Sequence, residues 1–480
     1  MLSTLRRGLL IGNEEVFTNK EIEVVNPATH ETIGISSQAS LIEVDRAVDL
    51  AVSAQKKWSI SDLSERRDKL FEIAKLIKDS ELELARILTI EQGKPLKDSR
   101  KEVDFASQVF GYYAENLHLL KTEHRASKSI DIQSQVLHPP LGVVAGIIPW
   151  NYPVDLWAWK VAPALAAGNA IIMKPPLETP LSPGFLARLV VEAGIPTGLL
   201  ADLPGGVEVG MALSSHSAIR GISATCSTPT GISILRNSVE TLKRVTLELG
   251  GNCPFIVMDD SNIQLAAAAA ARRSFSNAGQ ICIAVNRIIV NSRIADTFVE
   301  ALVDIVDNMA VGDGILDDSV MGPVTTSSVK KKTNEHVADA LSRGGKRVTK
   351  RLEVLDSNLT SSNFLPPTVI DNISSSSKLA TEETFGPAVG ILRVNSTEEA
   401  IREANNSPFG LAAYVFTSDV EKGAKVAEEL DFGGIGININ DITELDAPFG
   451  GWKMSGIGRE LGPEGLLAMT ESKHVRTRLL

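Results

Sequence analysis

Residues 142–149, GVVAGIIP, decide the fold, because they form a short apolar run suited to a β-strand and closed by a proline. A helix-like stretch follows as far as Leu165, and a second apolar strand, NAIIM, occupies residues 169–173. The alternation continues with a helix at 183–193 and strand-like segments at 199–203 and 219–224. Strands that alternate with helices predict a parallel α/β sheet with right-handed crossovers.

The flanking segments extend this pattern in both directions. Residues 41–103 show helical apolar spacing with charges between, and residues 130–137 alternate as in an exposed strand. Beyond Gly250 and Gly251 the alternation begins again with PFIVM, a long helix and RIIVN, which predicts a second α/β lobe. A chain of 480 residues is expected to divide in this way, because single hydrophobic cores stop growing beyond about 250–300 residues.

Charge and cysteine content exclude several classes of protein. The formal charge is 48 − 59 = −11, which weighs against a nucleic-acid or anionic membrane partner. Three cysteines without a C-x-x-C pair predict neither a disulfide framework nor a metal site. The N-terminal apolar run at 9–11 is too short for a signal peptide, and no apolar stretch reaches membrane-spanning length. We therefore expect a cytoplasmic protein.

The segment NAGQIC, residues 277–282, offers the first chemical candidate. It places Cys282 at the end of a small, glycine-containing turn that follows the alanine-rich helix at 266–271. A thiolate is a strong nucleophile, and backbone N–H groups in a polar loop lower the pKa of a thiol. Cys282 is therefore a candidate nucleophile, and the alternative is a buried structural cysteine.

Two polar side chains at the ends of apolar runs are the next candidates. Glu248 in LELGG lies between two leucines, and an apolar setting raises a carboxyl pKa toward the range of a general base. Asn151 in PWNYP follows a buried strand end, where its amide could donate to a developing oxyanion. The alternatives are a strand-end glutamate that points to water and an asparagine that only makes a turn.

Five segments, PWNYP, LELGG, NAGQIC, EETFGP and PFGGWKMSGIGRELG, stand in this order along the chain. Together they resemble the signature motifs of the aldehyde dehydrogenase superfamily, over essentially the whole sequence. The resemblance implies NAD(P)+-dependent oxidation of a small aldehyde to a carboxylic acid by a homodimer or homotetramer. It implies a Rossmann-like cofactor domain (1–119 and 140–250), an α/β catalytic domain (251–455) and a small β oligomerisation flap (120–139 and 456–480).

Carried onto these positions, the resemblance makes Cys282 the nucleophile and Glu248 the general base. Asn151 and the backbone N–H of Cys282 form the oxyanion hole, and no metal is required. Because acylating relatives generally lack a base at the place of Glu248, hydrolysis to the free acid is expected. The residues implied in binding NAD or NADP are Ile147, Pro149, Trp150, Lys174, Leu177, Gly205, Gly210, Ser227, Leu249, Glu383 and Phe385.

Two positions depart from the family pattern. Leu177 stands where the family usually has a glutamate that binds the ribose hydroxyls of NAD+. Leucine neither binds a 2′-hydroxyl nor repels a 2′-phosphate, which leaves the preference between NAD and NADP open. Cys226 replaces a glycine and Ala224 a phenylalanine in the loop beside the nicotinamide. Cys226 could be an oxidation-sensitive partner of Cys282, and a packed thiol is the simpler interpretation.

The substrate is expected to be a neutral hydroxy-, aliphatic or aromatic aldehyde. Trp159 stands where succinate semialdehyde dehydrogenases usually place an arginine, and Glu444 and Asp155 would repel an anion. Succinate semialdehyde and an amino-aldehyde remain the alternatives. The implied pocket residues are Tyr152, Asp155, Leu156, Trp159, Ile281, Ile283 and Glu444.

Other classes of function fit the sequence less well. A non-catalytic scaffold, as in some lens crystallins, predicts loss of the cysteine, the base or the amide donor, and all three are present. A cysteine hydrolase needs a histidine base, and His216 and His336 lie in polar segments that look like surface.

Overall fold

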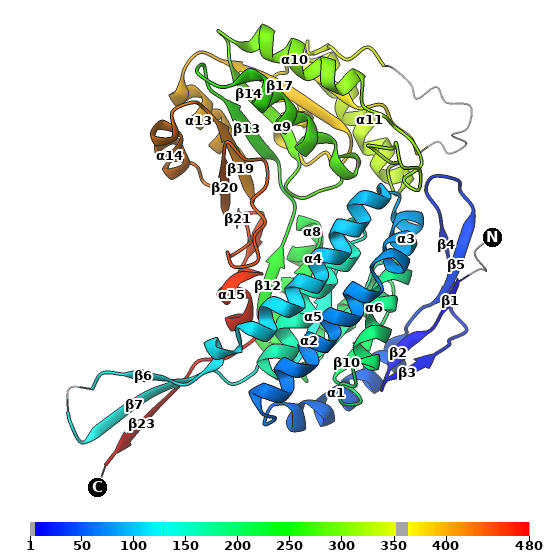
Figure 1. Ribbon diagram of the computed structural model, residues 1–480, viewed down its shortest axis with the longest axis vertical. Helices are drawn as coiled ribbons and strands as arrows, with labels where there is room; N and C mark the ends of the chain where they lie inside the picture. The colour runs from blue at the N-terminus through cyan, green and yellow to red at the C-terminus, as the bar shows by residue number, and fades with distance from the viewer. Residues whose placement is uncertain (1–4, 128, 352–362, 480) are drawn as a thin grey trace.

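The computed structural model describes residues 5–127, 129–351 and 363–479. Within these residues two lobes, each built on a sheet with helices on both faces, lie one above the other, and a slender three-stranded arm projects from the lower lobe (Figure 1). The predicted α/β class is thereby confirmed.

The lower lobe is built on a sheet whose described strands run in the order β22-β12-β11-β8-β9-β10-β2-β3. The central five are parallel, and the predicted strands 142–149, 169–173, 199–203 and 219–224 are among them. Their bounds are β8 (Val143–Ile147), β9 (Ala170–Lys174), β10 (Leu200–Asp202), β11 (Ile219–Thr225) and β12 (Arg244–Glu248). Antiparallel strands β2 (Leu9–Ile11), β3 (Glu14–Val16) and β22 (Gly456–Ile457) complete the edges.

Helices cover both faces of this sheet. They are α1 (Leu41–Trp58), α2 (Leu63–Asp79), α3 (Glu81–Gln92), α4 (Leu96–Glu115), α5 (Pro153–Ala167), α6 (Leu181–Glu192), α7 (Val207–Ser215) and α8 (Thr228–Ser238). Local sequence sets their ends. Ser40 and Glu43 form a reciprocal capping box at the start of α1, and Gly168, with φ of 96°, ends α5 in the left-handed region.

The upper lobe has the described strand order β15-β16-β17-β14-β13-β19-β20. All its neighbours are parallel except β15 and β16. The strands are β13 (Cys253–Val257), β14 (Val285–Asn291), β15 (Lys346–Arg347), β16 (Thr368–Asp371), β17 (Ala388–Val394), β19 (Ala412–Phe416) and β20 (Gly434–Ile437). Its helices are α9 (Ile263–Phe275), α10 (Ala295–Asp307), α11 (Ser327–Ser342), α12 (Lys378–Thr381), α13 (Thr397–Asn405) and α14 (Val420–Glu428).

Smaller sheets complete the chain. Strands β1 (Leu5–Arg7), β4 (Glu21–Val25) and β5 (Thr32–Ser37) form a sheet near the N-terminus, and β18 (Phe409–Gly410) pairs with β21 (Trp452–Lys453). The arm consists of β6 (Glu123–Arg125), β7 (Ile132–Leu137) and β23 (Lys473–Arg478) (Figure 1). Of the segment 456–480, β23 joins this arm, whereas β22 pairs with β12 in the lower sheet and α15 (Gly462–Leu467) packs against α5. Among the described residues, no helix is long and apolar enough to cross a membrane.

Candidate active site

Three neighbouring strands of the lower sheet end at the candidate site. Because β8, β11 and β12 are adjacent and parallel, the loops at their carboxyl ends lie side by side. The loop after β8 carries Asn151, the loop after β11 carries Cys226, and β12 ends with Glu248. The backbone N–H of Cys226 donates to the carbonyl oxygen of Glu248 across 3.0 Å, which ties two of these loops together.

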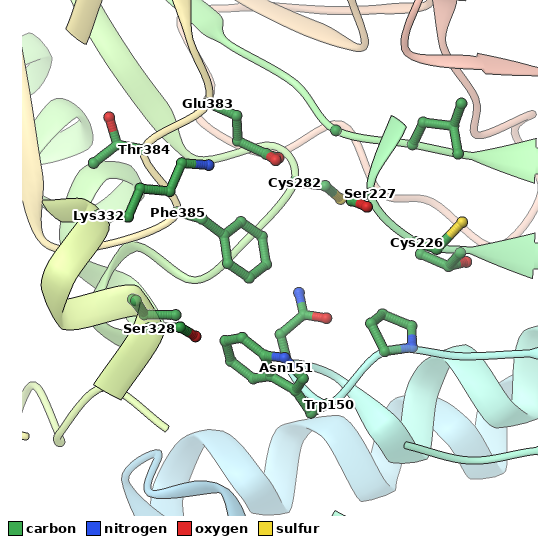
Figure 2. A pocket seen from close by; sticks show the side chains of 15 residues that line it. Trp150, Asn151, Cys226, Ser227, Cys282, Ser328, Lys332, Glu383, Thr384 and Phe385 are labelled. Carbon is green, nitrogen blue, oxygen red and sulfur yellow. The ribbon is translucent and has the colours of Figure 1, made fainter. Parts of the chain in front are cut away.

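A cavity of about 350 Å³ opens between these loops and the upper lobe (Figure 2). The side chains of Asn151 and Glu383 are directed toward Cys282 from two sides of it. Its lining includes eight of the predicted site residues: Pro149, Trp150, Asn151, Ser227, Leu249, Cys282, Glu383 and Phe385. It also includes Thr225, Cys226, Gly250, Ser328, Val329, Lys332 and Thr384.

Sequence reasoning missed the contribution of α11. Ser328, Val329 and Lys332 come from this helix, where the run KKKT reads as an ordinary solvated face. The other predicted residues lie outside the cavity lining: Ile147 and Glu248 are buried in the lower sheet, and Lys174, Leu177, Gly205 and Gly210 lie along β9 and α7 or the loops beside them.

The loop before Cys282 is held in a strained conformation. Asn277 and Ala278 have φ of 49° and 54°, a region that costs non-glycine residues free energy and is retained where the surroundings impose it. The Asn277 side chain supplies that restraint, because it accepts from the Gln92 amide at 3.0 Å and donates to the Asn151 carbonyl at 3.1 Å. Gly279 follows with φ of 73°, and a Cβ there would lie 2.4 Å from the carbonyl oxygen of Gly386. Only glycine fits at this position.

The acidity of the Cys282 thiol differs from the expectation that the loop lowers its pKa. Burial raises the pKa of Cys282, and the neighbouring acidic groups of Cys253, Glu383 and Glu248 raise it further. Cys253 is its close neighbour, since the Cys253 sulfur contacts the Cys282 carbonyl oxygen at 3.5 Å. The backbone N–H that lowers the pKa is the weakest of these effects. The resting thiol is therefore protonated, and a base must take its proton before attack.

Asn151 is buried beside Cys282. Its amide donates to the carbonyl oxygen of Gln280 at 3.0 Å, which uses one of its two N–H bonds and leaves the other free to donate. The ammonium of Lys94 also holds this residue, because it donates to the backbone carbonyl oxygen of Asn151 at 2.7 Å. Because its side chain and its backbone are both held in place, Asn151 needs no rearrangement to donate to an oxyanion that forms beside it.

Glu248 is buried rather than directed at water, with 1% of its surface exposed. Among the described residues neither carboxylate oxygen has a hydrogen-bond partner. Burial raises the pKa of Glu248 well above its usual value, and the charge of Glu460 adds to this, while Lys160 and Arg459 oppose it. Lys160 and Glu460 themselves form a buried ion pair at 2.8 Å. The predicted apolar setting of Glu248 is thus present, and it shifts the pKa of this carboxyl in the direction that a general base needs.

The cavity and the residues around Lys174 have the chemistry that the two ends of a dinucleotide require. Phe385 meets Trp150 edge to face at 5.5 Å, which gives flat apolar walls. The Glu383 carboxylate accepts from the Gly251 N–H at 3.0 Å and reaches the cavity. At the other end, Lys174 lies beside Gly210 on α7, with its Cδ 3.7 Å from the place of a Cβ, and helix N-termini favour phosphate. Leu177 is half-buried nearby, and Glu178 is exposed.

Four of the predicted substrate residues are buried apolar side chains, and the others are polar. Leu156, Trp159, Ile281 and Ile283 are buried, and the Trp159 ring packs edge to face on Phe449 at 5.1 Å. The Lys94 ammonium lies 3.7 Å from the centre of the Tyr152 ring. Glu444 is exposed.

Burial affects two groups that the sequence placed differently. It raises the pKa of Asp155 well above its usual value, with Glu102 adding to the effect, and this direction weakens the repulsion of an anion by Asp155. His336 is buried rather than on the surface, with its Nδ1 3.1 Å from the Thr384 hydroxyl. Among the described residues no group of three or more His, Cys, Asp or Glu could hold a metal ion.

Fold and cavity together are those of a nucleotide-dependent oxidoreductase with a cysteine on its cavity wall. Comparison with known proteins makes the assignment specific. The pattern of the aldehyde dehydrogenase family matches residues 16–475, and the chain belongs to this family. It is an NAD(P)+-dependent oxidoreductase that acts on small aldehydes.

Relatives of known activity and structure match along nearly the full length. The succinate semialdehyde dehydrogenase of Acinetobacter baylyi is 37% identical over 94% of this chain and 93% of its own. The NADP(+) succinate-semialdehyde dehydrogenase of Escherichia coli K12 is 35% identical over 98% and 97%. The crystal structure of betaine aldehyde dehydrogenase from Staphylococcus aureus with NAD+ superimposes with a TM-score of 0.97 at 35% identity, covering 100% of this chain and 96% of the other.

Proposed function

We propose that this enzyme oxidises its aldehyde through a covalent thioester on Cys282. The observation that carries the proposal is that the Cys282 thiol, the Asn151 amide and the Glu383 carboxylate face one cavity. The thiolate of Cys282 attacks the carbonyl carbon, and the carbonyl oxygen becomes an oxyanion. Asn151 and the Cys282 N–H donate to that oxygen, and a donor of this kind contributes roughly 3–4 kcal/mol to lowering the barrier.

Bound NAD(P)+ supplies the acceptor for the hydride that leaves the same carbon. On this proposal Glu383 and Phe385 position the nicotinamide ribose and ring, and Lys174 holds the adenosine side. Glu248, as its carboxylate, takes the proton from the Cys282 thiol and releases it to solvent, and it later takes a proton from the water that hydrolyses the thioester. The upward shift of its pKa supports both transfers, because it makes the carboxylate a stronger base than an exposed glutamate.

We infer hydrolysis, rather than transfer to a second acceptor, because Glu248 is a buried carboxyl whose charge acts on Cys282. The product is then the free carboxylic acid. The cofactor is NAD or NADP; one relative is named for NADP(+), and one neighbouring structure contains NAD+. The relatives are named for different aldehydes, and residues of this chain must therefore decide the substrate.

The arm supports assembly into a homo-oligomer. Strand β23 is exposed along most of its length, and three strands that project from the body bury little apolar surface of their own. We infer that a second copy covers them in a dimer or tetramer. Light scattering after size exclusion tests this, and a monomeric mass at working concentration would contradict it.

Purified protein is mixed with a panel of neutral, amino- and carboxy-aldehydes, and reduction of NAD+ and NADP+ is followed separately. We expect turnover that is lost in Cys282→Ala while the cofactor still binds. Turnover that survives in Cys282→Ala would remove the cysteine from the mechanism. An enzyme inactive with every aldehyde would favour the non-catalytic scaffold.

A further inference from the structure

Arg273 is a buried cation that the prediction of a neutral substrate did not consider. It lies in the last turn of α9, nine residues before Cys282. Its side chain is 9% exposed, whereas Arg272 beside it is exposed. The guanidinium forms an ion pair with the Asp441 carboxylate and donates from Nε to the Asn440 carbonyl oxygen. Among the described residues nothing accepts from Nη1.

The guanidinium lies close to the groups around the nucleophile. Burial raises the pKa of Tyr414, and the positive charge of Arg273 is the largest effect that opposes it. The hydroxyl of Tyr414 donates to the carbonyl oxygen of Ile283, the residue after Cys282, at 2.9 Å. The charge of Arg273 also lowers the pKa of Tyr152, the residue after Asn151, against burial and Glu102. The charge of Arg273 therefore acts on Tyr414 and Tyr152, and these residues adjoin the segments that carry Cys282 and Asn151.

The two partners of the ion pair, Arg273 and Asp441, are buried to different extents. Asp441 is 47% exposed on its loop, against 9% for its partner. A buried guanidinium always needs an anion near it, whereas a half-exposed carboxylate loses little by turning to water. Of the two acids expected to repel an anion, Asp155 has a pKa that burial raises, and Glu444 is exposed, where solvent screens its charge.

We propose that Arg273 recognises a carboxylate at the far end of a short aldehyde substrate, and that Asp441 takes the place of that carboxylate when no substrate is bound. This inference rests on the proposed function and selects the semialdehyde alternative over a neutral aldehyde. It also excludes an amino-aldehyde at this position, because the same cation would repel an ammonium group.

The test compares 4-oxobutanoate with its methyl ester, which has a similar shape and no charge. In Arg273→Met the ratio of kcat/KM for the acid to that for the ester should fall about 100-fold, mostly through KM for the acid. Arg273→Lys should keep part of the ratio. Arg272→Met is the matched control, since it removes an equal charge from the surface of the same helix turn, and it should keep the wild-type ratio.

Asp441→Asn provides the opposite change without touching the cation. Removing the competing carboxylate should raise the ratio several-fold. The inference would be overturned if Arg273→Met lowered kcat/KM equally for the acid and the ester and Asp441→Asn left their ratio unchanged. Arg273 would then only hold the loop at Asn440. A wild-type preference for the ester would overturn it as well.

Binding separates this inference from the proposed function. In a Cys282→Ala background, calorimetry with 4-oxobutanoate measures recognition without chemistry. Weaker binding on adding Arg273→Met supports the role of Arg273 even if turnover fails for another reason, and unchanged binding overturns it. Thermal melting identifies a variant that has not folded. If Arg273→Met has not folded, the acid-to-ester ratio of Asp441→Asn tests the inference instead.

Discussion

The side-chain amide of Asn277 donates to the backbone carbonyl of Asn151 across 3.1 Å, and thereby joins the loop of the nucleophile to the loop of the amide donor. The two residues belong to different lobes, since one follows α9 and the other follows β8. The geometry of attack is therefore set by a contact between lobes, and neither loop can shift alone.

Replacing Asn277 by alanine should loosen this contact. The change leaves the buried Gln92 amide and Asn151 carbonyl with fewer partners, and we expect roughly 1–3 kcal/mol of lost stability. It should also lower kcat more than it raises KM for the cofactor. Urea unfolding and steady-state kinetics measure the two effects, and unchanged kcat would mean that the loop is positioned by other contacts.

Glu248→Gln should slow the attack by Cys282 and block hydrolysis of the thioester that does form. The glutamine keeps the size of the side chain but cannot take a proton from water, and the acyl thioester should accumulate on Cys282. Intact-protein mass spectrometry detects it. In the wild type, hydrolysis should rise with pH through the pKa of Glu248, which burial raises above its usual 4.5, because only the carboxylate acts as a base. If Glu248→Gln hydrolysed the thioester at the wild-type rate and with the wild-type pH profile, the base would be another residue.

Alkylation of Cys282 should be slow at neutral pH and accelerate with alkalinity. Burial raises the pKa of this thiol, and since only the thiolate reacts, each pH unit below the pKa gives about a tenfold change in rate. Burial also raises the pKa of Cys226 to about 12. Iodoacetamide labelling between pH 7 and 9, with Cys226→Ala as the control, measures this. A rate already constant at pH 7 would mean a depressed pKa.

Leu177→Glu should turn the enzyme toward NAD+. A carboxylate at this place would repel the 2′-phosphate of NADP+ and accept from the ribose hydroxyls of NAD+. We expect kcat/KM for NADP+ relative to NAD+ to fall about tenfold or more. Leu177→Gln is the matched control without charge and should change the ratio less. If both variants behave alike, the side chain at 177 does not face the ribose.

Strand order explains what the sequence could predict and what it could not. Asn151, Cys226 and Glu248 follow apolar strands that alternate with helices, and adjacency of such strand ends in a parallel sheet brings these residues together. Lys332 and Arg273 lie on helices of the other lobe, and which face of a helix reaches a site depends on how lobes pack. The depth of burial could not be predicted from the sequence either. His336 is therefore buried where a surface position was expected, and the pKa of Cys282 is raised where a lowered one was expected.

The contact of Gly279 with the carbonyl of Gly386 has a practical meaning for anyone who wishes to redesign this enzyme. It locks the nucleophile's loop to the segment that carries Glu383 and Phe385, and a substitution at the nicotinamide end will disturb the chemistry along with coenzyme binding. Among the described residues, no hydrogen bond joins Lys174 or Leu177, at the adenosine end, to the loop of Cys282. Coenzyme choice is therefore an independently adjustable property of this scaffold.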